Sequence, residues 1–201
     1  PYKARSNQVT ARELLDRGAE QIAQRSTGHP ETFAMLTGTM GQIYNRLGVP
    51  DRAIALLSQA RAAYERLHDS DVQVAAMTNE LGIALLASGK LEQAHAELAR
   101  ALEMRTQLLG ADSPEVAETM MNLGTVAFER GQLAAAERYF RDSLALHARN
   151  GRSQTSDAAL VKLELANLLS QLGRYTEAIG LLEEALSVDR VALGVDHPRV
   201  I

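Results

Sequence analysis

The feature that most constrains the fold is an internal repeat with a period of about 42 residues. Gly48, Gly89, Gly131 and Gly173 are separated by 41, 42 and 42 residues, and each lies between two amphipathic segments. A glycine in such a place is typical of a turn between two helices. One helix pair cannot bury its apolar face alone, so successive pairs stack. The period therefore predicts a row of helix pairs.

Other residues recur at fixed distances from these glycines. A small residue follows five positions later, a large apolar residue nine later and a second small residue twelve later: Ala53, Ala94, Ala136 and Ala178; Leu57, Leu98, Phe140 and Leu182; Ala60, Ala101, Ser143 and Ala185. Upstream of each turn stands a recurring pair: Met40-Gly41, Leu81-Gly82, Leu123-Gly124 and Leu165-Ala166. Small residues let two antiparallel helices approach, while Leu or Phe fills the space between pairs. Four units therefore stand in register.

The pattern predicts the position of each helix. First helices are expected at about 30–47, 71–88, 114–130 and 155–172, and second helices at about 51–68, 91–109, 133–150 and 175–193. Pro30, Pro114 and Pro198 lie 84 residues apart, each at the first position of a first helix, where the missing N–H removes no helical hydrogen bond. Cap-forming residues precede the first helices: His29, Ser70, Ser113, Thr155 and His197.

The expected organisation has four parts. Residues 1–9 form a linker tail, 10–28 a capping helix that begins with the capping box Thr10 to Glu13, 29–197 four repeats, and 198–201 the start of a further repeat. We therefore expect the chain to be cut from a longer polypeptide. The expected fold is an all-α, right-handed superhelical solenoid of antiparallel helix pairs.

Composition narrows the function. The formal net charge of -4 argues against nucleic acid, whose binders gather basic residues on one face. Without cysteine there is no disulfide and no thiolate nucleophile. No apolar run approaches the roughly 20 residues of a membrane-spanning helix, so membrane insertion is not expected. A cytoplasmic location is expected, or a periplasmic one if a membrane helix precedes the chain.

The repeat resembles the tetratricopeptide repeat. The residues that carry the resemblance are Met40-Gly41 with Tyr44, Gly48, Ala53, Leu57 and Ala60, and their equivalents in the next two units. The length of the unit and the junction 109–117 look like the 42-residue subtype of kinesin light chains. The family's usual Trp is absent, and Ala166 stands in place of a glycine. The resemblance implies a protein that holds another protein or a peptide and that has no cofactor.

The stretch 9–19 is similar to the segment that precedes the repeats in certain bacterial Ser/Thr protein kinases. This resemblance implies that the chain is the regulatory or sensor region of such a kinase. A freestanding scaffold or adaptor and a self-association module remain the alternative interpretations.

The resemblance also implies where a partner binds, because in this family the first helices line the concave wall. Helical spacing separates the core face from a second face that is expected to point inward. The expected partner-binding residues are Gln42, Asn45, Asn79, Ile83, Leu86, Asn122, Thr125, Phe128, Glu164, Asn167 and Gln171. Amides and small apolar groups suit an extended segment. For each apolar residue the alternative is packing against a neighbouring helix.

No pattern in the sequence indicates catalysis. His29 and His197 occupy equivalent junctions and are interpreted as turn residues, and no two histidines stand four apart, so no metal site is expected. Glu183-Glu184 is interpreted as a solvated helix face, since paired catalytic carboxylates must converge in a pocket. We therefore expect neither catalytic residues nor a metal in this chain.

Overall fold

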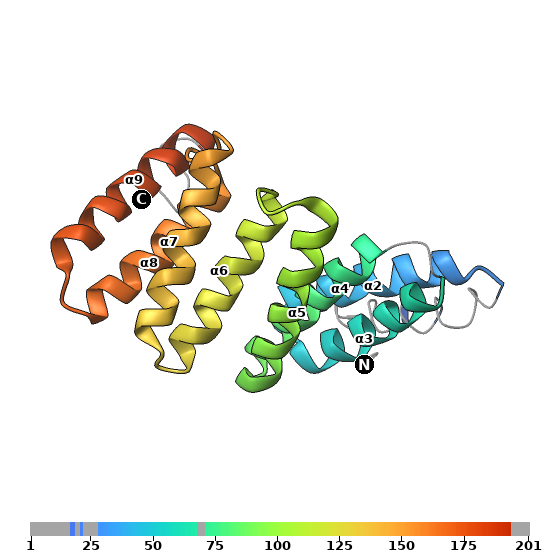
Figure 1. The fold of residues 1–201 in the computed structure, drawn as a ribbon. Coiled ribbons are helices and arrows are strands. Elements are labelled where there is room, and N and C mark those ends of the chain that lie inside the picture. The colour runs from blue at the N-terminus through green and yellow to red at the C-terminus, as the bar shows by residue number, and fades with distance from the viewer. Residues whose placement is uncertain (1–16, 19–20, 22–27, 68–70, 194–201) are drawn as a thin grey trace, which may run out of the picture.

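A computed structural model describes residues 17–18, 21, 28–67 and 71–193. Its eight labelled helices form four antiparallel pairs stacked in one row (Figure 1). The pairs are α2 (Pro30–Arg46) with α3 (Pro50–Leu67), α4 (Asp71–Ala87) with α5 (Leu91–Leu109), α6 (Pro114–Glu129) with α7 (Leu133–Arg149), and α8 (Ser156–Gln171) with α9 (Tyr175–Leu193). All eight ends of the predicted first helices and all eight of the second lie within one residue of these bounds. The predicted capping helix 10–28 falls largely outside the described residues, and 198–201 wholly outside.

The helices form two layers. Each first helix packs against its own second helix and also approaches the next first helix, so that α2, α4, α6 and α8 follow one another. Within the described residues, the backbones of successive second helices do not approach each other. A row whose members touch on one side and separate on the other is curved toward the touching side. The first helices therefore line the concave face, as the resemblance to the tetratricopeptide repeat implied.

Glycine serves two purposes in the first three pairs. Gly89 has a φ of 73°, in the left-handed region that favours glycine, and it turns the chain from α4 into α5. Gly82 instead lies where α4 meets α5: a Cβ built there would stand 2.5 Å from Leu98 Cγ. Leu98 is fully buried as a result of this close approach. The turn glycine and the packing glycine thus explain the two glycines that recur in the period.

Side-chain caps start two of the first helices. The Ser113 hydroxyl accepts a hydrogen bond from the Val116 N–H at 3.3 Å, and the Thr155 hydroxyl accepts one from the Ala158 N–H at 3.3 Å. Both are predicted N-caps. His29 precedes α2 but its side chain makes no capping hydrogen bond, so Pro30 alone marks that start.

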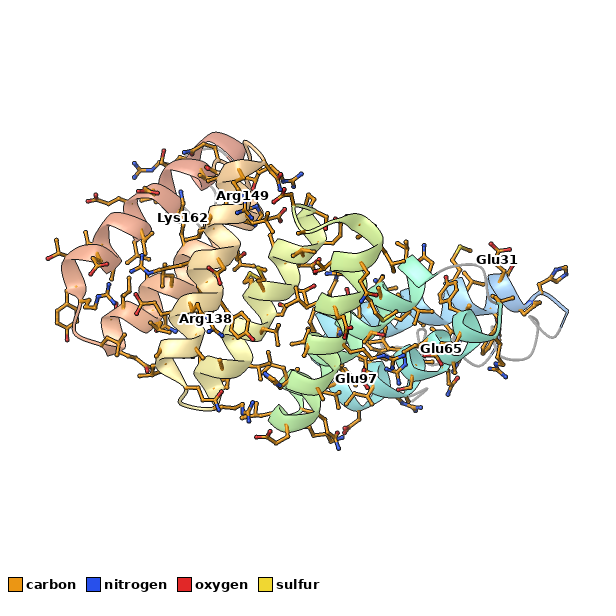
Figure 2. The ribbon with its side chains drawn as sticks, viewed as in Figure 1. Glu31, Glu65, Glu97, Arg138, Arg149 and Lys162 are labelled. Carbon is orange, nitrogen blue, oxygen red and sulfur yellow. The ribbon has the colours of Figure 1, made fainter. Side chains whose placement is uncertain are left out.

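Ion pairs connect successive second helices across the gap between their backbones. Arg61 of α3 binds Glu97 of α5 at 2.7 Å, and Glu65 binds Arg100 at 3.4 Å; Figure 2 labels both glutamates. The same arrangement joins α7 to α9, where Arg141 binds Glu177 at 3.3 Å. Ion pairs thus bridge these second helices on the convex side, in addition to the packing of each second helix against the next first helix. Among the described helices, none is long and apolar enough to span a membrane.

Candidate binding surface

The structure places the eleven predicted residues on the four first helices. Asn167 and Gln171 are exposed, and seven others are half-buried: Gln42, Asn45, Ile83, Leu86, Thr125, Phe128 and Glu164. Asn79 and Asn122 are buried, at 0% and 8% exposure. Nine of the eleven therefore retain surface that a partner can contact.

Asn79 and Asn122 join helices and do not face the open groove. The Asn122 amide donates to Asn79 Oδ1 at 3.4 Å, and the Asn79 amide donates to Glu118 Oε1 at 3.4 Å. Because buried polar groups are satisfied internally, these amides hold α4 against α6. The prediction that Asn79 and Asn122 lie on the open concave wall is therefore wrong, because both side chains are buried between helices.

A second polar contact holds α2 against α4. Asn45 Nδ2 donates to the Glu80 main-chain oxygen at 3.1 Å and to Glu80 Oε2 at 3.2 Å, and Gln42 Nε2 donates to Glu80 Oε1 at 3.5 Å. Burial raises the pKa of Glu80, the nearby charge of Glu118 raises it further, and the hydrogen bond from Asn45 opposes both. The side-chain amides of Gln42 and Asn45 therefore already make hydrogen bonds within the protein.

Arg105 was missed by the sequence analysis. It lies on α5, is only 6% exposed, and its guanidinium donates to the Glu115 main-chain oxygen at 2.9 Å, to Glu118 Oε2 at 3.1 Å and to Thr119 Oγ1 at 2.8 Å. The available signal was its spacing, four residues after the buried Ala101, which puts it on the inward side of α5. Arg105 fixes the position of the Glu118 carboxylate.

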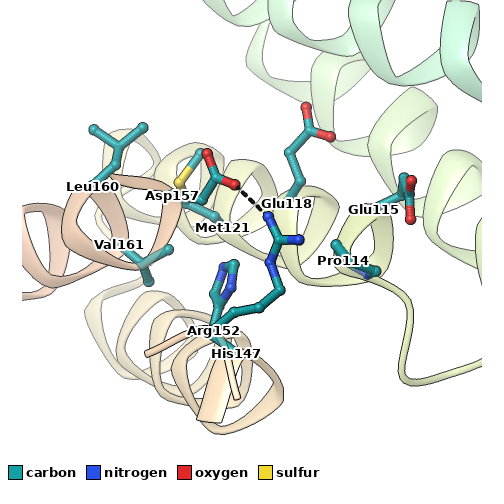
Figure 3. A pocket seen from close by; sticks show the side chains of 9 residues that line it. All are labelled: Pro114, Glu115, Glu118, Met121, His147, Arg152, Asp157, Leu160 and Val161. Atoms are coloured by element: carbon teal, nitrogen blue, oxygen red, sulfur yellow. Dashed lines mark hydrogen bonds and ion pairs between the residues drawn. The ribbon is translucent and has the colours of Figure 1, made fainter. Parts of the chain in front are cut away.

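A pocket of about 450 Å³ opens between the first turns of α6 and α8 (Figure 3). Its walls combine apolar and acidic side chains, and His147 of α7 and Arg152 of the following loop complete it. The lining residues are Pro114, Glu115, Glu118, Met121, His147, Arg152, Asp157, Leu160 and Val161. None of them was among the predicted site residues, because the pocket depends on how one pair is placed against the next.

His147 is a buried polar group that faces this pocket. It is 3% exposed, its ring rises from α7 toward the cavity, and its Nδ1 has no hydrogen-bond partner among the described residues (Figure 3). Burial lowers the pKa of His147, and the charge of Arg152 lowers it further against the opposing effect of Asp157. The imidazole is therefore neutral at neutral pH, with one ring nitrogen that accepts and one that donates.

The concave surface of α6 and α8 is acidic. Arg152 and Arg105 reach it, but each is paired with one of its carboxylates, Asp157 at 3.2 Å and Glu118 at 3.1 Å. Glu129 and Glu164 approach each other farther along the helices, and burial together with the charge of Glu129 raises the pKa of Glu164. Within the described part of the chain, no group of three or more His, Asp or Glu side chains could hold a metal ion.

Stacked antiparallel helix pairs that each contact only their neighbours define the class of helical-repeat solenoids. The family model described as tetratricopeptide repeat matches residues 31–107 and 73–149, and a second model of the same description matches 159–199. The chain belongs to the tetratricopeptide repeat family, and its repeat is of the kinesin-light-chain-like type.

Similar proteins agree with this assignment. Protein KINESIN LIGHT CHAIN-RELATED 1 of Arabidopsis thaliana is 22% identical over 247 residues, which cover 100% of this chain and 41% of the relative. The chain thus spans less than half the length of that curated relative. The structure of BtubC (BKLC) from P. vanneervenii has a TM-score of 0.72 at 21% identity, covering 94% of this chain and 75% of that one.

A third similar structure is that of the Rap conjugation gene regulator of the plasmid pLS20 in complex with the Phr* peptide. It has a TM-score of 0.74 at 20% identity, and the match covers 89% of this chain and 47% of that chain. At these identities both solved structures show a shared fold.

Proposed function

We propose that this chain is a protein-interaction module that binds a peptide or an extended segment of another protein on its concave face. The observation that carries the proposal is the α6–α8 part of that face, where Asn167 and Gln171 of α8 are exposed and Thr125 and Phe128 of α6 are half-buried. Amides that hydrogen-bond a partner's main chain, next to apolar patches, suit an extended segment. The peptide complex of the similar Rap regulator supports the same use of the fold.

The test compares two matched double variants in affinity capture from a lysate of the host. Asn167→Arg with Gln171→Arg places two bulky charges on the concave face, whereas Gln59→Arg with Gln93→Arg adds the same charge to exposed positions of the second helices. A partner that the unaltered chain and the convex variant capture, and the concave variant loses, supports the proposal. Equal capture by both variants would move the binding surface off the concave face.

We further propose that the module is the regulatory or sensor region of a bacterial Ser/Thr protein kinase. The similarity of stretch 9–19 to the segment that precedes the repeats in such kinases supports this. The reading frame upstream of Pro1 provides the test. A kinase domain there is expected, whereas a start codon directly upstream would favour a freestanding scaffold.

Self-association is a second candidate, because α9 exposes large apolar side chains. Tyr175, Ile179 and Leu182 are 65%, 56% and 43% exposed. Leu182 stands at the repeat position where Leu57, Leu98 and Phe140 are at most 1% exposed. Light scattering across a concentration series tests this candidate: association that Ile179→Glu abolishes would support it, and a monomer at all concentrations would exclude it.

A further inference from the structure

The pocket between α6 and α8 carries an unmet hydrogen-bonding capacity. Nδ1 of His147 and Nε of Arg152 are both buried and lack a partner among the described residues. Leaving a buried polar atom unpaired costs about 1–3 kcal/mol, so native proteins rarely retain one without a reason. Both residues line a cavity of about 450 Å³, although the two atoms themselves are shielded from solvent. A group that enters this cavity satisfies them when the side chains around them shift.

The charge at the rim indicates what kind of group would enter. Glu115, Glu118 and Asp157 line the pocket. Arg105 pairs with Glu118 and Arg152 with Asp157, whereas Glu115 forms no salt bridge with another described residue. First-turn carboxylates such as Glu115 and Asp157 also stabilise their helices through the helix dipole. That role does not explain Glu129 and Glu164, which lie in the later turns of α6 and α8. The carboxylates thus extend along both helices.

The walls indicate the shape of the group. Pro114, Met121, Leu160 and Val161 give the cavity an apolar lining beneath the acidic rim. Leu160, on the first helix α8, is 40% exposed and so offers apolar surface to a partner. The side chains of lysine and arginine have an apolar stem and a charged head, and they bury the stem while the head meets polar groups.

We propose that this pocket receives a lysine or arginine side chain of the segment bound on the concave face, so that the module selects a basic partner. The stem packs on Met121 and Leu160, and the charged head donates hydrogen bonds to the rim carboxylates and to the acceptor nitrogen of neutral His147. A main-chain carbonyl of the same segment supplies the acceptor that Arg152 Nε lacks. The inference rests on the proposed concave binding and adds the chemistry of the partner.

Three fluorescent peptides of one length and one apolar frame test the inference, with their charged positions all lysine, all glutamine or all glutamate. Anisotropy titrations with the full chain are expected to show the lysine peptide binding about tenfold more tightly than the glutamine peptide, because charge-assisted hydrogen bonds are about twice as strong as neutral ones. The glutamate peptide is expected to bind most weakly. A lysine peptide that binds no better than the glutamine peptide overturns the inference.

A matched pair of variants separates the pocket from the overall negative charge. Glu115→Gln and Glu183→Gln change the net charge equally, but Glu115 stands at the rim and Glu183 is exposed on α9. The first is expected to weaken binding of the lysine peptide several-fold and the second to leave it unchanged, since a distant exposed charge is screened. Equal effects overturn the inference. The imidazole NMR resonances of His147 should also shift with the lysine peptide, and unshifted resonances would contradict its part.

The outcomes distinguish this inference from the proposed function. If the glutamine or glutamate peptide binds best, and the Asn167→Arg, Gln171→Arg variant loses that binding, the concave face binds peptides and only the preference for basic residues is wrong. If none of the three peptides binds, the inference is overturned, and the capture experiment decides on concave binding by itself.

Discussion

Single glycines decide how closely the two helices of a pair approach. A Cβ at Gly41, Gly82 or Gly124 would stand 2.5 to 2.6 Å from the side chain of Leu57, Leu98 or Phe140. The fourth pair has Ala166 at this place, and its partner Leu182 is 43% exposed where the others are buried. Ala166 thus occurs in the pair whose large apolar residue, Leu182, is exposed and can shift away from the added methyl group. The sequence showed the substitution, and the structure gives its physical reason.

Gly82→Ala is expected to destabilise the protein by about 1–3 kcal/mol, the usual cost of overpacking, because the added methyl group meets Leu98 Cγ and lies 3.3 Å from its main-chain nitrogen. Gly180→Ala, in helix α9 with nothing within 4 Å of its Cβ, is the control. It should stabilise by up to about 1 kcal/mol through helix propensity. Urea denaturation measures both, and changes of the same sign would contradict the packing argument.

The buried imidazole makes stability depend on pH. Above its ordinary pKa of 6.5, His147 is neutral in the folded and unfolded chains and contributes no pH dependence. As the pH falls below 6.5, the unfolded chain takes up a proton while the folded chain, whose pKa is lowered by burial, does not. The free energy of unfolding is therefore expected to decrease there. Denaturation at a series of pH values should show a smaller decrease for His147→Gln; equal slopes would show that His147 is not the cause.

At the scale of the helix, sequence alone was sufficient for the pairs and their ends. Proline at the first helical position, a glycine in each turn and the fixed apolar spacing are local signals, so they can be read one unit at a time. The burial of Asn79 and Asn122 could not be predicted from a single unit in this way. It depends on how far each pair is turned and shifted against the next, and that offset results from the packing of whole helices. The α6–α8 pocket could not be predicted for the same reason.

The start of α8 depends on Thr155, whose hydroxyl accepts from the Ala158 N–H and donates to the Arg152 main-chain oxygen at 2.8 Å. Thr155→Ala is expected to cost about 1 kcal/mol, as for other N-cap losses. Thr155→Ser keeps the hydroxyl and should recover most of it, whereas Ser156→Ala, at an exposed first helical position, should change little. Chemical denaturation of the three variants provides the measurement. A loss shared by Ser156→Ala would place the effect outside the cap.

For the whole molecule, the two sides of the row are held by different forces. Each second helix packs against the next first helix, the first helices also approach one another, and ion pairs join α3 to α5 and α7 to α9. Exposed ion pairs such as Arg141–Glu177 contribute only about 0–1 kcal/mol each and are screened by salt, whereas the partly buried Arg61–Glu97 pair is screened less. High salt should therefore release the convex side without unfolding the pairs, and the row should curve more strongly.

Energy transfer between two dyes measures this curvature. Because the chain has no cysteine, Gln59→Cys on α3 and Ser187→Cys on α9 provide two labelling sites at exposed positions. Transfer is expected to rise with potassium chloride as the ends come closer. A chain that also carries Arg61→Gln and Arg141→Gln should start at higher transfer and respond less to salt. An identical response in both chains would assign the change to something other than these ion pairs.

The ion pairs between successive second helices also bear on how easily the row of helix pairs can bend. Because exposed ion pairs are weak, the distance between neighbouring second helices should change more easily than the packing within each helix pair. The ion pairs lie on the opposite side from the concave face, where the proposed function places a partner. Under that proposal, charge on the convex side is expected to influence how closely the first helices approach the bound segment.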